Sequence, residues 1–124
     1  IAALPAGVRV LVVDDEEAVR LGMCSLLSEM GLQVRSVDSS AAALALLEDF
    51  EPQIVLADFR LRGDDDGLAT IRKLRQRLPQ LPALLISGDT APSRLQEART
   101  AGVPLLHKPV AIADLREAIA QALA

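Results

Sequence analysis

Five residues whose side chains could do chemistry stand at or just after the ends of apolar, strand-like runs: Asp14, Asp15, Asp58, Ser87 and Lys108. The runs are 10–13, 54–57, 83–86 and 103–107. In an open parallel α/β sheet, the carboxyl ends of the strands converge on one crevice, and ligands bind there. The sequence therefore predicts a single pocket that holds three carboxylates, a hydroxyl and an ammonium group.

The chemistry of this pocket follows from its charges. Three carboxylates packed together resist ionisation unless a cation joins them. Oxygen ligands favour a hard cation, and Mg²⁺ is the usual one beside phosphate. The lysine would then face the anion. The residue set predicts a site that moves a phosphoryl group.

The elements that must position these residues alternate along the chain. Apolar runs predict strands at 8–13, 32–37, 53–57, 83–87 and 103–107. Helical spacing predicts helices at 17–30, 41–49, 68–78, 92–101 and 111–123. Regular alternation of this kind requires a parallel sheet with right-handed crossovers, so the expected class is α/β.

Composition sets the limits for the function. The chain of 124 residues fits one domain, and its hydrophobic fraction of 51% supports a packed core. Aromatic residues make up 2%, so the core must be aliphatic. The net charge of −4 argues against nucleic-acid binding. No apolar run approaches the roughly 20 residues that cross a bilayer, so we expect no membrane contact by this domain.

The ordered strings VLVVDDE, LADFRL, LLISGD and LLHKPV resemble the receiver domain of two-component response regulators. The resemblance covers essentially the whole chain, 1–124. It implies a flavodoxin-like (βα)5 fold with strand order 2-1-3-4-5. It also implies a phosphorelay partner, either a histidine kinase or a histidine phosphotransfer domain.

The resemblance assigns the metal ligands as well. Asp15 and Asp58 would ligate Mg²⁺ through their side chains, and Asp14 would act largely through water. The backbone carbonyl of Arg60 would supply a further ligand. Asp14 and Asp15 have an alternative interpretation, in which they cap the following helix and place charge in its first turn.

The remaining implied roles concern the phosphoryl group. Asp58 would accept it from a phosphohistidine, Lys108 would pair with a phosphoryl oxygen, and Ser87 would hydrogen-bond to it. The bond between Lys108 and Pro109 would be cis. Such a domain catalyses its own phosphorylation and dephosphorylation and is not a stand-alone enzyme. Two alternatives remain: a receiver-like protein-binding module without phosphate turnover, and a Mg²⁺-dependent phosphohydrolase.

The sequence departs from the receiver pattern at two positions and in the length of one loop. Leu105 stands where receivers commonly carry the Phe or Tyr that swings inward on activation. Arg62 replaces a usual proline, and the loop that contains it is about one residue longer than usual. Arg60 and Asp89 carry opposite charges, and we expect them to bridge over the site and slow hydrolysis of the phosphate.

The chain begins at Ile1 without Met, which suits a piece excised from a longer protein. The strings LLISGDT and LLHKPV also resemble receivers at the carboxyl end of hybrid sensor histidine kinases. The expected location is therefore the cytoplasm, including the cytoplasmic part of a membrane-bound sensor kinase.

Overall fold

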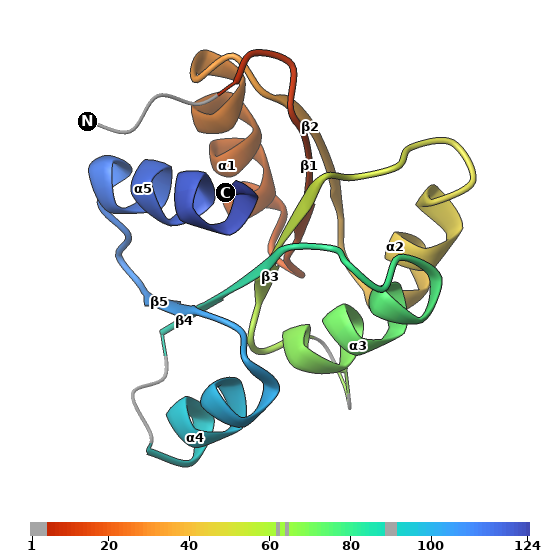
Figure 1. Ribbon diagram of the computed structural model, residues 1–124, viewed down its shortest axis with the longest axis vertical. Coiled ribbons are helices and arrows are strands. Elements are labelled where there is room, and N and C mark those ends of the chain that lie inside the picture. The colour runs from red at the N-terminus through yellow and green to blue at the C-terminus, as the bar shows by residue number, and fades with distance from the viewer. Residues whose placement is uncertain (1–4, 62, 64, 89–91) are drawn as a thin grey trace.

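The computed structural model describes residues 5–61, 63, 65–88 and 92–124. Strands and helices alternate in the predicted order (Figure 1). The strands are β1 Arg9–Val13, β2 Gln33–Val37, β3 Ile54–Asp58, β4 Ala83–Ser87 and β5 Leu105–His107. The helices are α1 Glu17–Glu29, α2 Ser40–Leu46, α3 Gly67–Arg77, α4 Pro92–Ala101 and α5 Ile112–Leu123.

All strand pairs are parallel, and the sheet has the order β2-β1-β3-β4-β5. This confirms the predicted flavodoxin-like fold. The register aligns the carboxyl ends, because Val13 lies opposite Val37 on one side and Ala57 on the other. Ser87 lies opposite His107 in the same way. Residues that follow these strand ends therefore meet at one edge of the sheet.

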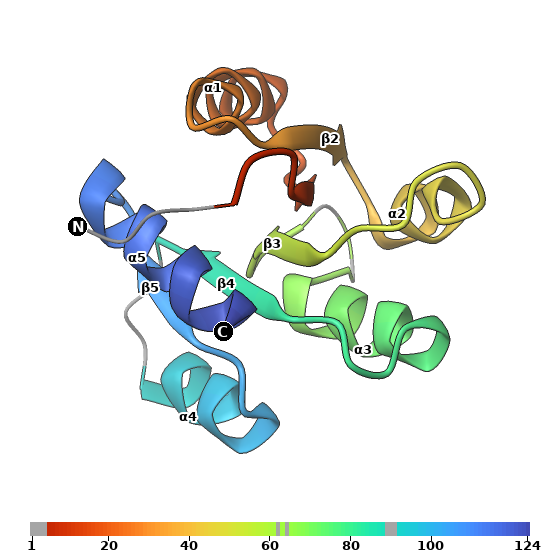
Figure 2. The same ribbon diagram turned by 45° about the horizontal axis from the view of Figure 1, so that its top comes forward.

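Helices cover both faces of the sheet, with α1 and α5 on one face and α2, α3 and α4 on the other (Figure 2). Alternate strand residues point to opposite faces. Val10, Val12 and Leu56 accordingly pack with Leu27 of α1 and Ile119 of α5. The opposite faces of β1, β3 and β4 pack against α2, α3 and α4 through Leu11, Val13, Val55, Ala57 and Leu85.

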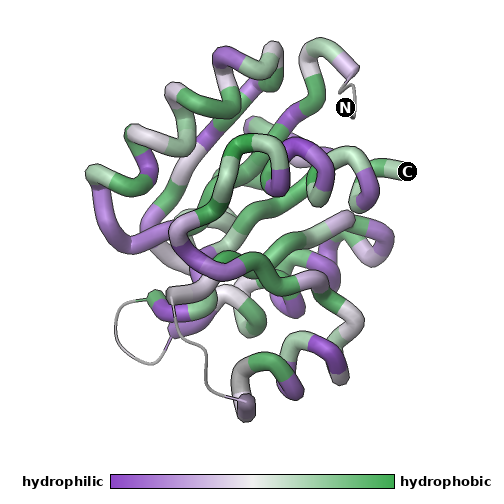
Figure 3. Tube along the Cα trace, turned by 90° about the vertical axis from the view of Figure 1, so that its left-hand side faces the viewer, coloured by the Kyte–Doolittle hydropathy of each residue, from purple (hydrophilic) through white to green (hydrophobic). Residues whose placement is uncertain are grey.

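The central strands are apolar along nearly their whole length, which is visible as green segments inside the molecule (Figure 3). Every residue of β4 is buried, as are the first four residues of β3. Burial on both faces produces such continuous apolar runs in parallel strands. Among the described residues, no helix has the length and apolar character needed to cross a membrane.

Two element boundaries differ from the sequence prediction by more than one residue. Helix α2 ends at Leu46, because the next turn tightens: the amide of Leu47 donates to Leu44 O and that of Glu48 to Ala45 O. Strand β5 begins at Leu105. Ser39 caps the start of α2, since its Oγ accepts a hydrogen bond from the amide of Ala42 at 3.2 Å.

The backbone of Gly67, the first residue of α3, lies close against the carboxyl end of β3. A Cβ atom at this position would overlap the backbone carbonyl oxygen of Asp58 and would lie 2.9 Å from Leu85 Cδ2. Exposed Gly22 in α1 has no atom within 4 Å of its own Cβ position. The two glycines form a matched pair for testing this contact.

We expect Gly67→Ala to lower the free energy of unfolding by about 1–3 kcal/mol, because the overlap forces the backbone to shift. Gly22→Ala should raise it by roughly 0.5–1 kcal/mol, because alanine loses less conformational entropy in a helix. Urea unfolding of the three proteins measures both effects. Equal stability of Gly67→Ala and the parent would contradict the packing described here.

Candidate functional site

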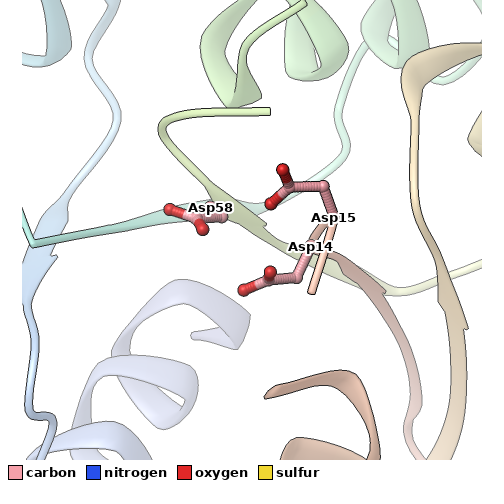
Figure 4. A group of neighbouring side chains, drawn as sticks. All are labelled: Asp14, Asp15 and Asp58. Atoms are coloured by element: carbon pink, nitrogen blue, oxygen red, sulfur yellow. The ribbon is translucent and has the colours of Figure 1, made fainter. Parts of the chain in front are cut away.

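Three carboxyl groups gather at the ends of the two central strands (Figure 4). Asp14 and Asp15 follow β1, and Asp58 is the last residue of its neighbour β3. Each offers one oxygen, and these oxygens lie within 4.8 Å of one another. Asp14 is buried, whereas Asp15 and Asp58 are partly exposed. The parallel register thus brings together residues that are more than forty positions apart in the sequence.

Lys108 approaches the carboxylates from β5. Its Nζ donates a hydrogen bond to Asp58 Oδ2 at 3.1 Å and lies 3.7 Å from Asp14 Oδ2. Its backbone amide donates to Ser87 O at 2.9 Å, which fixes the lysine beside the end of β4. The peptide bond between Lys108 and Pro109 is cis. One ammonium group therefore faces two of the carboxylates, and its side chain is 33% exposed.

An open depression of about 440 Å³ lies beside this cluster. Its lining residues come from the ends of β3, β4 and β5: Asp58, Arg60, Ser87, Gly88 and Lys108. Ser87, at the carboxyl end of β4, is only 2% exposed, and Arg60 is exposed. The structure thus brings all the predicted site residues to one edge of the sheet. Arg62 and Asp89 lie outside the described residues.

Neither Asp14 nor Asp15 is the cap of α1, so that alternative interpretation is wrong. The N-cap residue is Glu16, and it makes no side-chain capping bond. Asp14 instead contacts the helix in a different way, since its Oδ1 accepts a hydrogen bond from the Glu16 amide at 2.9 Å. The backbone carbonyl of Asp14 accepts a hydrogen bond from Arg20 Nη1 at 2.7 Å. Sequence reasoning missed Arg20, because a surface arginine in a helix carries no signal for such a contact.

The electrostatics of the cluster follow from its burial. Burial raises the pKa of Asp14 above its ordinary value, and the charges of Asp58 and Asp15 add to this rise. The Glu16 amide and the charge of Lys108 oppose it without cancelling it. For Lys108, partial burial acts to lower the pKa, but the hydrogen bond to Asp58 and the nearby negative charges outweigh it, so the pKa is raised.

These observations fit a hard divalent cation. Oxygen atoms from three carboxylates converge, and Mg²⁺ prefers oxygen ligands and is bound through one or two carboxylates beside phosphate. The pKa of Asp14 is raised first by burial and then by the negative charges of Asp58 and Asp15. A cation among these oxygens would relieve that repulsion.

The sequence model of the response regulator receiver domain family matches residues 10–120. The chain belongs to this family. Receiver domains generally bind Mg²⁺ at a cluster of acidic residues, which is the kind of cluster formed here. The receiver domain is also 41% identical over 118 residues to the transcriptional activator protein ExaE of Pseudomonas putida, an alignment that covers 93% of this chain and 55% of ExaE.

A second relative is the response regulator GacA of Pseudomonas aeruginosa, 33% identical over 122 residues, which covers 94% of this chain and 56% of GacA. The receiver domain thus spans about half the length of these curated relatives. A solved CheY-like receiver domain protein from Methanospirillum hungatei superposes with a TM-score of 0.84 at 25% identity. That match covers 95% of this chain and 94% of the solved one.

The raised pKa of Asp14 makes stability depend on pH. Between the ordinary value of 3.8 and the raised value, the folded receiver domain binds more protons than the unfolded chain. The free energy of unfolding therefore falls as the pH rises through this window and stays lower above it. Lys108 affects stability at alkaline pH. The stabilisation that comes from its raised pKa is complete below pH 10.5 and is lost as the pH rises through the raised pKa.

We expect Asp14→Asn to stabilise the metal-free receiver domain at pH 7 by on the order of 1 kcal/mol, because it removes a buried charge from the cluster. The gain should vanish below pH 3.8, where the unfolded aspartate is itself protonated. Urea unfolding in EDTA at several pH values measures it, with exposed Asp114→Asn as the control. A neutral-pH stability equal to or below that of the parent would refute this reading of the cluster.

Proposed function

We propose that Asp58 accepts a phosphoryl group from the phosphohistidine of a histidine kinase or a histidine phosphotransfer domain, with Mg²⁺ as the cofactor. One observation carries the proposal: Lys108 Nζ hydrogen-bonds to Asp58 at 3.1 Å within a cluster of three carboxylates. This arrangement places both candidate metal ligands and an anion-binding ammonium group next to the carboxylate of Asp58. Phosphoryl transfer depends mainly on such positioning and charge neutralisation.

The choice of Asp58 over its neighbours rests on access. Asp58 lines the open depression together with Ser87 and Lys108, whereas Asp14 and Asp15 do not. Asp14 is 4% exposed, and its Oδ1 is already occupied by the Glu16 amide. An incoming phosphoryl group would therefore reach Asp58 first.

The proposed metal ligands are Asp15 and Asp58 by their carboxylates, Asp14 largely through water, and the backbone carbonyl of Arg60. A bound Mg²⁺ would neutralise charge on the transferred phosphoryl group. The residues of the chain do the rest. Asp58 holds the acceptor oxygen at the end of β3. Lys108 is held beside it and is exposed enough to exchange its carboxylate partner for a phosphoryl oxygen. Ser87 supplies a hydroxyl at the base of the depression.

The readout of phosphorylation must differ from the aromatic switch of other receivers. Leu105 is partly buried and packs against the core cluster that faces α2, α3 and α4. A leucine has no ring to turn inward and no hydroxyl to expose. We propose that output does not depend on rotation of the side chain at position 105.

We further propose that residues 1–124 form one receiver domain within a longer cytoplasmic protein. ExaE is by its name a transcriptional activator and GacA a response regulator, and both extend well beyond the matched region. This favours a regulator with its own effector region. A hybrid sensor histidine kinase stays the second candidate, on the LLISGDT and LLHKPV strings.

We expect the parent domain, incubated with acetyl phosphate and Mg²⁺, to gain the mass of a single phosphoryl group. Asp58→Asn should remove the adduct entirely while leaving the free energy of unfolding within about 1 kcal/mol of the parent, because asparagine keeps the shape of the side chain. Asp38→Asn, which changes an exposed carboxylate just after β2, should label like the parent.

Intact mass spectrometry distinguishes the alternatives. A label that persists in Asp58→Asn would contradict the assignment of the acceptor. The parent remaining unlabelled would indicate a binding module without phosphate turnover. Rapid release of inorganic phosphate over many turnovers, without a detectable adduct, would indicate a phosphohydrolase.

A further inference from the structure

The loop between β3 and α3 is fastened to the start of α2 by one carboxylate. Asp65 Oδ2 accepts a hydrogen bond from the backbone amide of Ser40 at 2.8 Å. Asp65 Oδ1 accepts a second from Ser40 Oγ and a third from the Asp66 amide at 3.1 Å. Hydrogen bonds to Ser40 lower the pKa of Asp65 against the opposing effect of burial. Both oxygens of this carboxylate are thus committed to holding the loop.

Two buried hydroxyl groups extend this contact into the core. Ser40 is 4% exposed and Thr70 of α3 is fully buried. Thr70 Oγ1 donates a hydrogen bond to the carbonyl oxygen of Asp66 at 2.9 Å and lies 2.7 Å from Ser40 Oγ. We call Ser40, Asp65 and Thr70 the loop clamp. It joins α2, the loop and α3, with Ser40 and Thr70 buried and Asp65 partly exposed.

Arg60 lies in the first part of the same loop, two residues after the end of β3. Arg60 forms an isolated antiparallel bridge with Asp66, the residue directly after Asp65. The amide of Gly67 donates to Phe59 O at 2.9 Å and closes the base of the loop. Asp66 Oδ1 caps α3 through the amide of Ala69 at 2.7 Å. Asp66 is the chain neighbour of Asp65 and is bridged to Arg60. A displacement of Asp65 would therefore also move the backbone of Asp66 and Arg60.

We propose that Asp65 is a positioning residue for the metal site: through Ser40 and Thr70 it uses α2 to hold the backbone of Arg60 in place. This inference rests on the proposed function, in which the Arg60 carbonyl is a Mg²⁺ ligand. Groups that orient metal ligands commonly affect affinity strongly, although they do not touch the metal. Asp65 lies outside the carboxylate cluster formed by Asp14, Asp15 and Asp58.

A loop clamp that served stability alone would leave metal affinity unchanged in a fully folded variant. The test therefore measures Mg²⁺ affinity, with free MgCl₂ as the titrant, at a temperature where every variant is folded. We expect Asp65→Ala to raise the Mg²⁺ Kd about threefold to tenfold. This lies at or below the low end of the affinity losses that follow mutation of groups that orient metal ligands. Ser40→Ala should raise the Kd by a smaller factor, because the backbone bond from Ser40 to Asp65 remains.

The control is Asp38→Asn. Asp38 lies at the same edge of the sheet and makes no hydrogen bond or ion pair in the described part of the chain. The Asp38→Asn substitution removes one negative charge, as Asp65→Ala does, but leaves the loop clamp intact. The Mg²⁺ Kd of this variant should therefore stay within about 1.5-fold of the parent, as expected for a screened surface charge. Asp65→Asn, which keeps the side-chain shape and one acceptor oxygen, provides a second variant if Asp65→Ala does not fold.

Amide hydrogen exchange in EDTA gives a readout without metal. Loss of the clamp should accelerate exchange of the Gly67 amide at least about tenfold, because local opening of the loop breaks its bond to Phe59. The Asp38→Asn control should exchange like the parent.

The outcomes separate this inference from the proposed function. A parent that binds Mg²⁺ and labels on Asp58, with Asp65 variants of unchanged Kd and unchanged Gly67 exchange, would overturn the role of Asp65 alone. A Kd shift that Asp38→Asn reproduces would also overturn it, since charge alone would then explain the effect. A parent that binds no Mg²⁺ would overturn both.

Discussion

Repulsion among carboxylates at the ends of two adjacent strands is the constraint on which the rest of this structure depends. A parallel sheet in this register cannot separate Asp14, Asp15 and Asp58, because β1 and β3 are neighbours and end together. Burial makes the charge on Asp14 still less favourable. The Glu16 amide and the ammonium of Lys108 offset part of this cost.

The same constraint explains why the elements around the site are held so closely. A ligand set drawn from several strand ends works only if the ends stay in register. Lys108 is tied to the end of β4 through Ser87, and Gly67 lets α3 pack directly on the carbonyl of Asp58. The loop clamp applies the same logic to the β3–α3 loop, in which Arg60 is bridged to Asp66, the residue next to Asp65.

Sequence patterns predicted the order of elements and the edge at which the site residues meet, because strand burial and helix spacing are local properties. The strand order came from the receiver resemblance, and the sheet confirms it. The loop clamp was not predictable. Ser40 and Asp65 are 25 positions apart, and an aspartate in an acidic loop resembles any solvated charge until the fold places it against α2. The end of α2 was missed for a related reason, since the tightened turn after Leu46 follows an alanine-rich and leucine-rich run that favours continued helix.

The central claim is that the carboxylate cluster carries excess negative charge that a divalent cation relieves. Carbon-13 NMR of the Asp14 carboxyl group, titrated with pH in EDTA and again in saturating MgCl₂, tests it most directly. In EDTA, Asp14 should titrate above its ordinary value of 3.8, and Mg²⁺ should lower its pKa. An Asp14 that titrates at or below 3.8 in EDTA, or whose titration Mg²⁺ leaves unchanged, would contradict the account.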